Sequence, residues 1–206
     1  KFNKQNKYLK KGLALSPVKF GISFTTPLLN QAGALVNVYK DGSIYINHGG
    51  TEMGQGLFIK VAQVVANEFG VDIERVKVSA TSTAKVPNTS PTAASSGSDL
   101  NGMAAREACL RIKQNMSEFA LKHFDLSIGE LKFQDSCVLL GKKKITFDDF
   151  VSLSYLNRVE LFSNGFYKTP KIYFDAIKQK GRPFYYYSYG SCVSEVLVDC
   201  LTGEYK

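Results

Sequence analysis

The sequence predicts an α+β fold in which helices pack on mixed sheets. Short runs of alternating β-branched and aromatic residues indicate strands, and two longer segments repeat their apolar residues at helical spacing. The segments interleave as hairpin, helix, strand, loop, long helix and late strands, which favours mixed layers. With 206 residues, 44% of them hydrophobic, the chain is long enough to bury a core.

The first predicted element is a β-hairpin. The runs Ala34 to Tyr39 and Ser43 to Asn47 are rich in β-branched and aromatic residues, and the Asp41-Gly42 pair between them suits a turn with positive φ. Residues 57–69 then predict a helix, which Gly70 ends and which should pack on the hairpin.

Next come a short strand at residues 76–80 and a loop at residues 81–98, which are small and polar with two prolines. A long helix follows and ends near Phe124, with Ser98 or Asp99 as its N-cap. Its buried face is predicted from an apolar stripe at helical spacing, made by Ala105, Ala108, Ile112, Met116, Phe119 and Ala120.

Residues 125–160 predict an accessory lobe, with strands at 131–133 and 137–140 and a helix that opens at Thr146 and includes residues 150–155.

Residues 162–183 predict a loop with one or two strands, and residues 184–189 and 193–199 predict two more strands. The turn at Thr202-Gly203 has no predicted partner strand after it, and the first residue is Lys1 rather than Met. We therefore expect a piece of a longer protein.

The net charge and the lengths of the apolar runs bear on whether the protein binds nucleic acid or enters a membrane. The formal net charge is +8, but the lysines are dispersed and no aromatic-basic pattern accompanies them, so we expect no nucleic-acid partner. A basic surface can instead hold an anionic cofactor or dock an acidic subunit. No apolar run is long enough to span a membrane, and residues 1–11 lack the apolar centre of a signal peptide, so we expect a cytoplasmic protein.

Four cysteines, Cys109, Cys137, Cys192 and Cys200, show no metal-binding spacing. We expect them to be buried free thiols, with Cys192 and Cys200 on one face of a strand.

Two turns could carry chemistry. Residues 48–56 (HGGTEMGQG) join a strand to a helix, where glycines allow close approach and the helix N-terminus offers N–H groups to an anion. Residues 86–99 lead into the long helix and could do the same. The alternatives are a tight connection at the first turn and an exposed polar linker at the second, and the residues alone leave them open.

Several ordered motifs together resemble the molybdenum domain of the xanthine dehydrogenase family of molybdenum hydroxylases. They are KFGISFT at 19–25, PLLNQAG at 27–33, HGGTEMGQG at 48–56, PNTSPTAA at 87–94, DLNG at 99–102, GFYKTP at 165–170 and the run from Glu195 to Gly203. The match covers about residues 11–206.

The resemblance implies that the chain is part of a molybdenum-cofactor-binding domain. Residues 1–124 would form the wall for cofactor and substrate, 125–160 the accessory lobe, and 161–206 returning strands, truncated at the end. The cofactor-contacting residues would be Met53, Gly54, Gln55, Thr92, Ala93, Ala94 and Ser95, with Ala94 close to the molybdenum. Phe24 would pack against a planar substrate and Thr25 would hydrogen-bond to it.

The chain departs from the family at Gly97, where a second hydroxyl is common. His48 and Glu52 match no catalytic position of the family, and we expect capping or structural roles for both. No catalytic residue is expected in this chain, because the Phe-Gly-Gly, arginine-containing and Gly-Glu-Pro segments of the family are absent. The chain alone should be inactive.

By resemblance, the complete enzyme hydroxylates hypoxanthine or xanthine at a molybdenum-molybdopterin cofactor, and electrons leave through 2Fe-2S clusters and FAD in partner domains or subunits. The expected partners are these units, the remaining molybdenum-domain segments and a purine. Two alternatives stay open: a hydroxylase of aldehydes or other N-heterocycles, and a non-catalytic assembly module.

Overall fold

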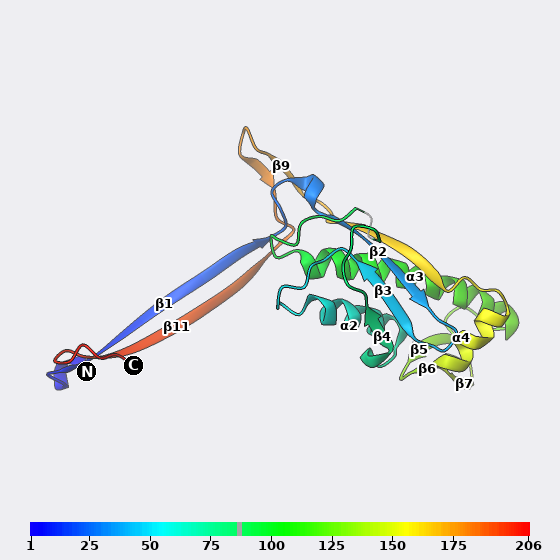
Figure 1. Ribbon diagram of the computed structural model, residues 1–206, viewed down its shortest axis with the longest axis horizontal. Coiled ribbons are helices and arrows are strands. Elements are labelled where there is room, and N and C mark those ends of the chain that lie inside the picture. The colour runs from blue at the N-terminus through cyan, green and yellow to red at the C-terminus, as the bar shows by residue number, and fades with distance from the viewer. Residues whose placement is uncertain (86–87) are drawn as a thin grey trace. The chain divides into compact units, whose positions relative to one another are not determined.

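The computed structural model describes residues 1–85 and 88–206 (Figure 1). Val86 and Pro87, which belong to the predicted polar loop and to one of the family motifs, lie outside the described residues. The chain divides into two compact units, one made of Lys1–Ile22 with Tyr186–Lys206 and the other of Ser23–Tyr185. The predicted α+β class is confirmed in the larger unit.

The larger unit is built on a four-stranded sheet of order β4-β3-β2-β8. The central pair β2 and β3 is the predicted hairpin, β8 is antiparallel to β2, and β4 is parallel to β3. The strands are β2 (Gln31–Val38), β3 (Ile44–His48), β4 (Val76–Val78) and β8 (Phe162–Lys168).

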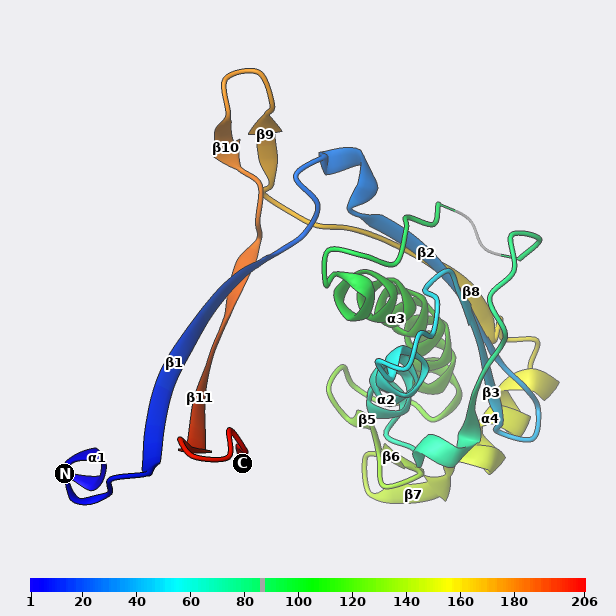
Figure 2. The same cartoon turned by 60° about the vertical axis from the view of Figure 1, so that its left-hand side comes forward.

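Two helices cover one face of this sheet (Figure 2). They are α2 (Leu57–Phe69), which ends at Gly70 as predicted, and α3 (Gly97–His123). The predicted N-cap of the long helix was wrong by two or three residues, because Ser96 occupies the N-cap and its hydroxyl donates to the Ala93 carbonyl instead of capping the helix. Two 3-10 turns, η1 (Pro27–Leu29) and η2 (Ile73–Arg75), precede β2 and β4.

The seam between α3 and β8 is unusually close. A Cβ on Gly165 of β8 would overlap the Ala104 carbonyl and lie 2.6 Å from the Ala108 nitrogen. Ala104, Ala105 and Ala108 are themselves completely buried, so small residues on both sides let the helix backbone rest on the strand.

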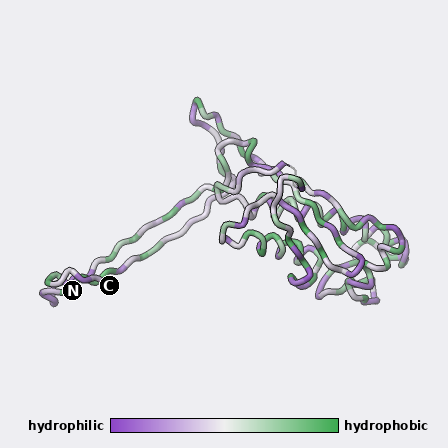
Figure 3. The backbone as a smooth tube through the Cα atoms, in the orientation of Figure 1, coloured by the Kyte–Doolittle hydropathy of each residue, from purple (hydrophilic) through white to green (hydrophobic). Residues whose placement is uncertain are grey.

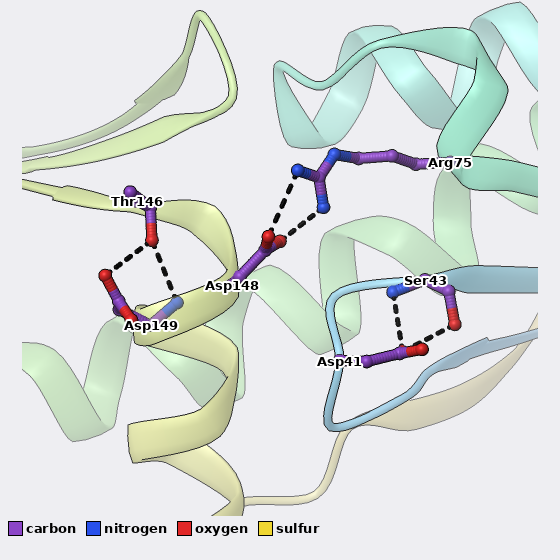
Figure 4. Close-up of polar contacts among 6 residues, drawn as sticks. All are labelled: Asp41, Ser43, Arg75, Thr146, Asp148 and Asp149. Carbon is purple, nitrogen blue, oxygen red and sulfur yellow. Dashed lines mark hydrogen bonds and ion pairs between the residues drawn. The ribbon is translucent and has the colours of Figure 1, made fainter.

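Residues 125–160 form a three-stranded sheet, β5-β6-β7, followed by α4. The Thr146 hydroxyl accepts from the Asp149 amide and caps α4, as predicted (Figure 4). The strand at 143–146 was missed because three of its four residues are exposed and its two consecutive lysines give no apolar alternation. The bounds are β5 (Leu131–Gln134), β6 (Cys137–Leu140), β7 (Lys143–Thr146) and α4 (Phe147–Leu156).

This three-stranded sheet shares its core with the main helices. Phe69 of α2 lies 5.8 Å from Phe147 and 6.5 Å from Phe133 between ring centroids, and Phe119 of α3 lies 6.4 Å from Phe150. The Arg75 guanidinium also donates hydrogen bonds to both carboxylate oxygens of Asp148 (Figure 4). The division of the chain at residues 124 and 160 stays a prediction.

The region 162–183 contains more strand than predicted. Besides β8, a small hairpin pairs β9 (Tyr173–Asp175) with β10 (Lys180–Arg182) in antiparallel register.

The smaller unit is a two-stranded antiparallel ribbon, in which β1 (Leu9–Ile22) pairs with β11 (Tyr186–Asp199) along its whole length. A short helix, α1 (Phe2–Gln5), precedes it. No element was predicted at residues 9–22, and the prediction of two strands at 184–189 and 193–199 was wrong, because β11 is continuous. Hydrophobic residues are scattered along both strands (Figure 3), and Leu13 and Val193 are 68% and 67% exposed.

The ribbon corrects two further predictions. Cys192 and Cys200 are exposed rather than buried, because a two-stranded ribbon has no core of its own to cover them. Cys109 is buried, as predicted, and Cys137 is half-buried. The turn at Thr202-Gly203 does have a partner after it, since Tyr205 bridges back to Val198.

We predict that Gly165→Ala strongly destabilises the larger unit, by at least about 2 kcal/mol, because the added methyl must displace helix backbone rather than a side chain. Chemical denaturation of the purified chain measures this. Gly12→Ala is the matched control, since nothing lies within 4 Å of a Cβ there. Equal effects of the two substitutions would contradict the close seam.

Candidate cofactor site

A pocket of about 440 Å³ lies in the larger unit where two distant segments meet. One segment is the turn from β3 into α2, and the other is the approach to α3. The pocket is lined by Met53, Gln55, Leu57, Lys60, Thr92, Ala93, Ala94, Ser95, Gly97 and Ser98. Six of the seven predicted cofactor-contacting residues are among them.

The remaining one, Gly54, is not on the lining but lies at the rim of the turn. Its φ is 96°, and a Cβ there would meet no atom within 4 Å. The space beside Gly54 is therefore open for a ligand to approach the backbone.

The two segments are joined by direct contacts. The Thr51 amide donates to the Thr92 hydroxyl at 2.9 Å. A Cβ on Gly49 would overlap the Thr89 side chain, so only glycine allows the second segment to lie this close to the turn.

Glu52 closes the start of α2. Its carboxylate accepts hydrogen bonds from the amides of Gly54, Gly56 and Phe58, at 2.9, 3.0 and 3.1 Å. These bonds, led by that of Phe58, lower the pKa of Glu52. The expected capping role is confirmed, and the amides of Gly54, Gly56 and Phe58 are occupied by this carboxylate.

Gln55 holds the shape of the turn itself. Its side-chain oxygen accepts from the Met53 amide at 2.6 Å and its nitrogen donates to the Thr51 carbonyl at 2.9 Å. The predicted cofactor residue thus also fixes the backbone around Met53.

His48 lies beneath the turn and is completely buried. Its Nδ1 accepts from the Gly50 amide at 3.1 Å, and its ring meets Phe58 edge-on at 5.2 Å. Burial lowers the pKa of His48 to about 4, so the ring is neutral and carries its proton on Nε2. The structural role expected for His48 is confirmed.

The second segment has a strained backbone. Ala94 and Ser95 are consecutive non-glycine residues with φ of 55° and 53°, in the left-handed region that such residues rarely occupy. Consecutive strained residues in a pocket indicate a binding surface whose shape is held by its surroundings.

Lys60 is the pocket residue that the sequence analysis missed. It projects from the first turn of α2, and its side chain makes no ion pair or hydrogen bond among the described residues. Lys60 is the one charged side chain among the described lining residues. Residues three apart on a helix lie on the same face, so the position of Lys60 three residues after Leu57, which also lines the pocket, could have indicated it.

The predicted substrate residues lie beside the pocket rather than on its lining. Phe24 is half-buried and Thr25 is exposed, in the loop before β2. The Ser23 amide donates to the Ala94 carbonyl at 3.4 Å, which attaches this loop to the second segment.

The residues fit an anionic, polar cofactor. Lys60 supplies positive charge, and the Gln55 amide and the Thr92, Ser95 and Ser98 hydroxyls supply hydrogen bonds. The described chain contains no group of three His, Cys, Asp or Glu that could ligate a metal.

The full length of the chain, residues 1–206, matches the model of the molybdopterin cofactor-binding domain. The chain belongs to this family. It is 45% identical to the xanthine dehydrogenase/oxidase of Gallus gallus and 47% identical to xanthine dehydrogenase 1 of Arabidopsis thaliana, over 100% and 99% of this chain. It spans 14% of the length of each of these relatives.

Solved structures share the fold of this molybdopterin cofactor-binding domain. Quinoline 2-oxidoreductase from Pseudomonas putida 86 aligns with a TM-score of 0.78 at 17% identity, over 96% of this chain and 26% of that one. CO dehydrogenase from Oligotropha carboxidovorans aligns with a TM-score of 0.78 at 20% identity, over 100% and 26%. No described helix is long and apolar enough to cross a membrane.

We predict that Thr92→Val uncouples the two segments, because the Thr51 amide loses its partner at a cost of about 1 kcal/mol. Amide hydrogen exchange at Thr51 should accelerate, while Thr92→Ser, which keeps the hydroxyl, should exchange as the wild type does. Unchanged exchange in the valine variant would contradict the contact.

We predict that His48 makes the chain less stable in acid. Its folded pKa of about 4 lies below the ordinary value of 6.5, so the unfolded chain binds the proton first as the pH falls. The stability advantage of wild type over His48→Asn should be full above pH 6.5 and shrink by up to about 3 kcal/mol by pH 4. Urea unfolding of both proteins across this range measures it, and a constant difference would be the contrary result.

Proposed function

We propose that this chain forms one wall of the active site of a purine hydroxylase similar to xanthine dehydrogenase. The observation that carries the proposal is the pocket, because it gathers Met53, Gln55 and residues 92–95 from distant parts of the chain around a lysine whose side chain has no described partner. The relatives named xanthine dehydrogenase support a purine, such as hypoxanthine or xanthine, as the substrate.

In this proposal the residues of the chain bind and orient the molybdopterin. Met53, Gly54 and Gln55 contact it from the turn, and Thr92, Ala93, Ala94 and Ser95 contact it from the second segment. Ala94 would pack close to the molybdenum, where its methyl group would exclude water without offering a ligand atom. When bound, the cofactor supplies the metal that carries out the hydroxylation.

Phe24 and Thr25 bind the purine. A half-buried aromatic ring can stack on a planar heterocycle while its edge stays fixed in the protein, and an exposed hydroxyl can donate or accept a hydrogen bond at the rim of the ring. Both residues belong to the loop that Ser23 attaches to Ala94, which keeps substrate and metal sites adjacent.

The rest of the chemistry lies outside this chain. The catalytic base, the FAD and the 2Fe-2S clusters belong to other segments, domains or subunits of a cytoplasmic enzyme. The 206 residues alone should therefore show no turnover.

The test uses the complete enzyme that carries this chain. We expect molybdenum and pterin to copurify with it and purines to be oxidised. Gln55→Ala should lower cofactor content and purine turnover by about tenfold, because it removes both a pocket amide and the bonds that shape the turn. Gln114→Ala, an exposed position on α3, is the matched control.

The outcomes separate the alternatives. A loaded enzyme that oxidises aldehydes or other heterocycles but not purines would replace the substrate class. An assembled protein without molybdenum or pterin would identify a non-catalytic module, and would overturn the proposal.

A further inference from the structure

Asn30 makes an unusual set of hydrogen bonds in the loop before β2. Its side chain is buried, with 1% exposure, at the end of η1. Its Oδ1 accepts from the Phe24 amide at 2.8 Å, and its Nδ2 donates to the carbonyls of Phe24 and Thr26 at 3.0 and 3.2 Å. A longer bond of 3.4 Å reaches the Pro27 carbonyl.

One side chain therefore satisfies both backbone polar groups of Phe24. A carboxamide presents an acceptor and two donors side by side, as a neighbouring strand would, so it fixes the backbone of the aromatic residue from both directions. Neither a carboxylate nor a hydrophobic side chain of similar size can do this.

Asn30 is in turn fixed to the rest of the larger unit. Its backbone carbonyl accepts from the Thr169 amide at 3.0 Å, just beyond the end of β8. The next residue, Gln31, receives 3.0 Å bonds from the Ser90 hydroxyl and from the Asn88 side chain. The anchor of Phe24 is thus attached to the segment that continues into the cofactor pocket.

Packing does not supply the same restraint. Thr25, Thr26 and Leu28 in this loop are exposed, so few apolar contacts hold its shape. Ser23 adds a strained φ of 127°, which neighbouring contacts must maintain. The hydrogen bonds of Asn30 are the main described restraint on where the Phe24 ring lies.

We propose that Asn30 is a positioning residue for substrate selectivity, which holds Phe24 at the angle needed to stack on a planar heterocycle. The inference rests on the proposed substrate role of Phe24. Asn30 does not itself touch substrate or cofactor. Its loss should weaken purine binding and orientation while leaving the molybdopterin in place.

The test compares variants of the complete, molybdenum-containing enzyme. Asn30→Asp keeps the shape and the acceptor for the Phe24 amide, but it replaces the donor with an oxygen facing three carbonyls. We expect kcat/KM for hypoxanthine to fall about tenfold or more, mainly through KM, with molybdenum and pterin content unchanged. Asn157→Asp, an exposed position at the end of α4, should match the wild type.

A double-mutant cycle with Phe24→Leu separates positioning from general stability. If Asn30 acts through Phe24, the double variant should be no worse than Phe24→Leu alone, because there is no longer a ring to position. Additive losses in the cycle would overturn the inference, since a residue with only a structural role weakens the protein whatever stands at position 24.

The remaining outcomes are distinct. If Phe24→Leu alone leaves purine kinetics unchanged in loaded enzyme, the proposed substrate site is wrong. If Phe24→Leu lowers kcat/KM and Asn30→Asp does not, only the Asn30 inference is wrong.

Asn30→Ser, which leaves room for a bridging water, is the second variant. Loss of molybdenum or of the fold in both Asn30 variants would make Asn30 a structural residue and overturn the inference.

Discussion

The contact of α3 with β8 is the constraint on which the site depends. At Gly165 the strand has no side chain, and the facing helix residues Ala104 and Ala108 are small enough for backbone to lie on backbone. This seam lies in the first half of α3, a helix of 27 residues, and holds that part of the helix against the sheet. Its first turn, and the strained residues just before it, therefore have a fixed position relative to the sheet that carries the glycine turn. Without this seam, the two segments that line the pocket would not be held in fixed positions relative to one another.

The second constraint acts on the glycine turn, because residues of both α2 and α3 lie too close to it for a side chain at Gly50. A Cβ at Gly50 would lie 2.7 Å from the Asn101 amide nitrogen of α3 and would overlap Leu57 of α2. Beneath it, the Ser79 hydroxyl donates to Asn47 at 2.5 Å and the Thr81 hydroxyl donates to the Gly50 carbonyl at 2.8 Å. These bonds pair the Ser79 and Thr81 hydroxyls beneath the turn, whereas the buried Nε2 of His48 has no hydrogen-bond partner among the described residues.

The parts of the fold that could be predicted are those in which the local pattern of apolar residues shows which side is buried. The helix at 57–69 has a buried stripe and a glycine in the left-handed conformation at its end, and both signals are local. The strand at 9–22 gives no such signal, because most of its residues are exposed and its apolar residues do not mark one buried face. The pocket residues were predicted through resemblance. Lys60 and Asn30 were missed because their importance comes from contacts that form only in the folded chain.

Two features of the pocket, its strained backbone and the charge of Lys60, favour the binding of a ligand. Ala94 and Ser95 of the pocket, and Ser23 in the loop beside it, hold positive φ values at a cost of about 1 kcal/mol each. Lys60 brings a positive charge to the same place without a described partner. A folded chain that maintains both is preorganised for an anion, since binding neutralises the lysine and uses the strained backbone without reshaping it. By mass action such a ligand stabilises the native state, so cofactor loading and folding should reinforce one another in this domain.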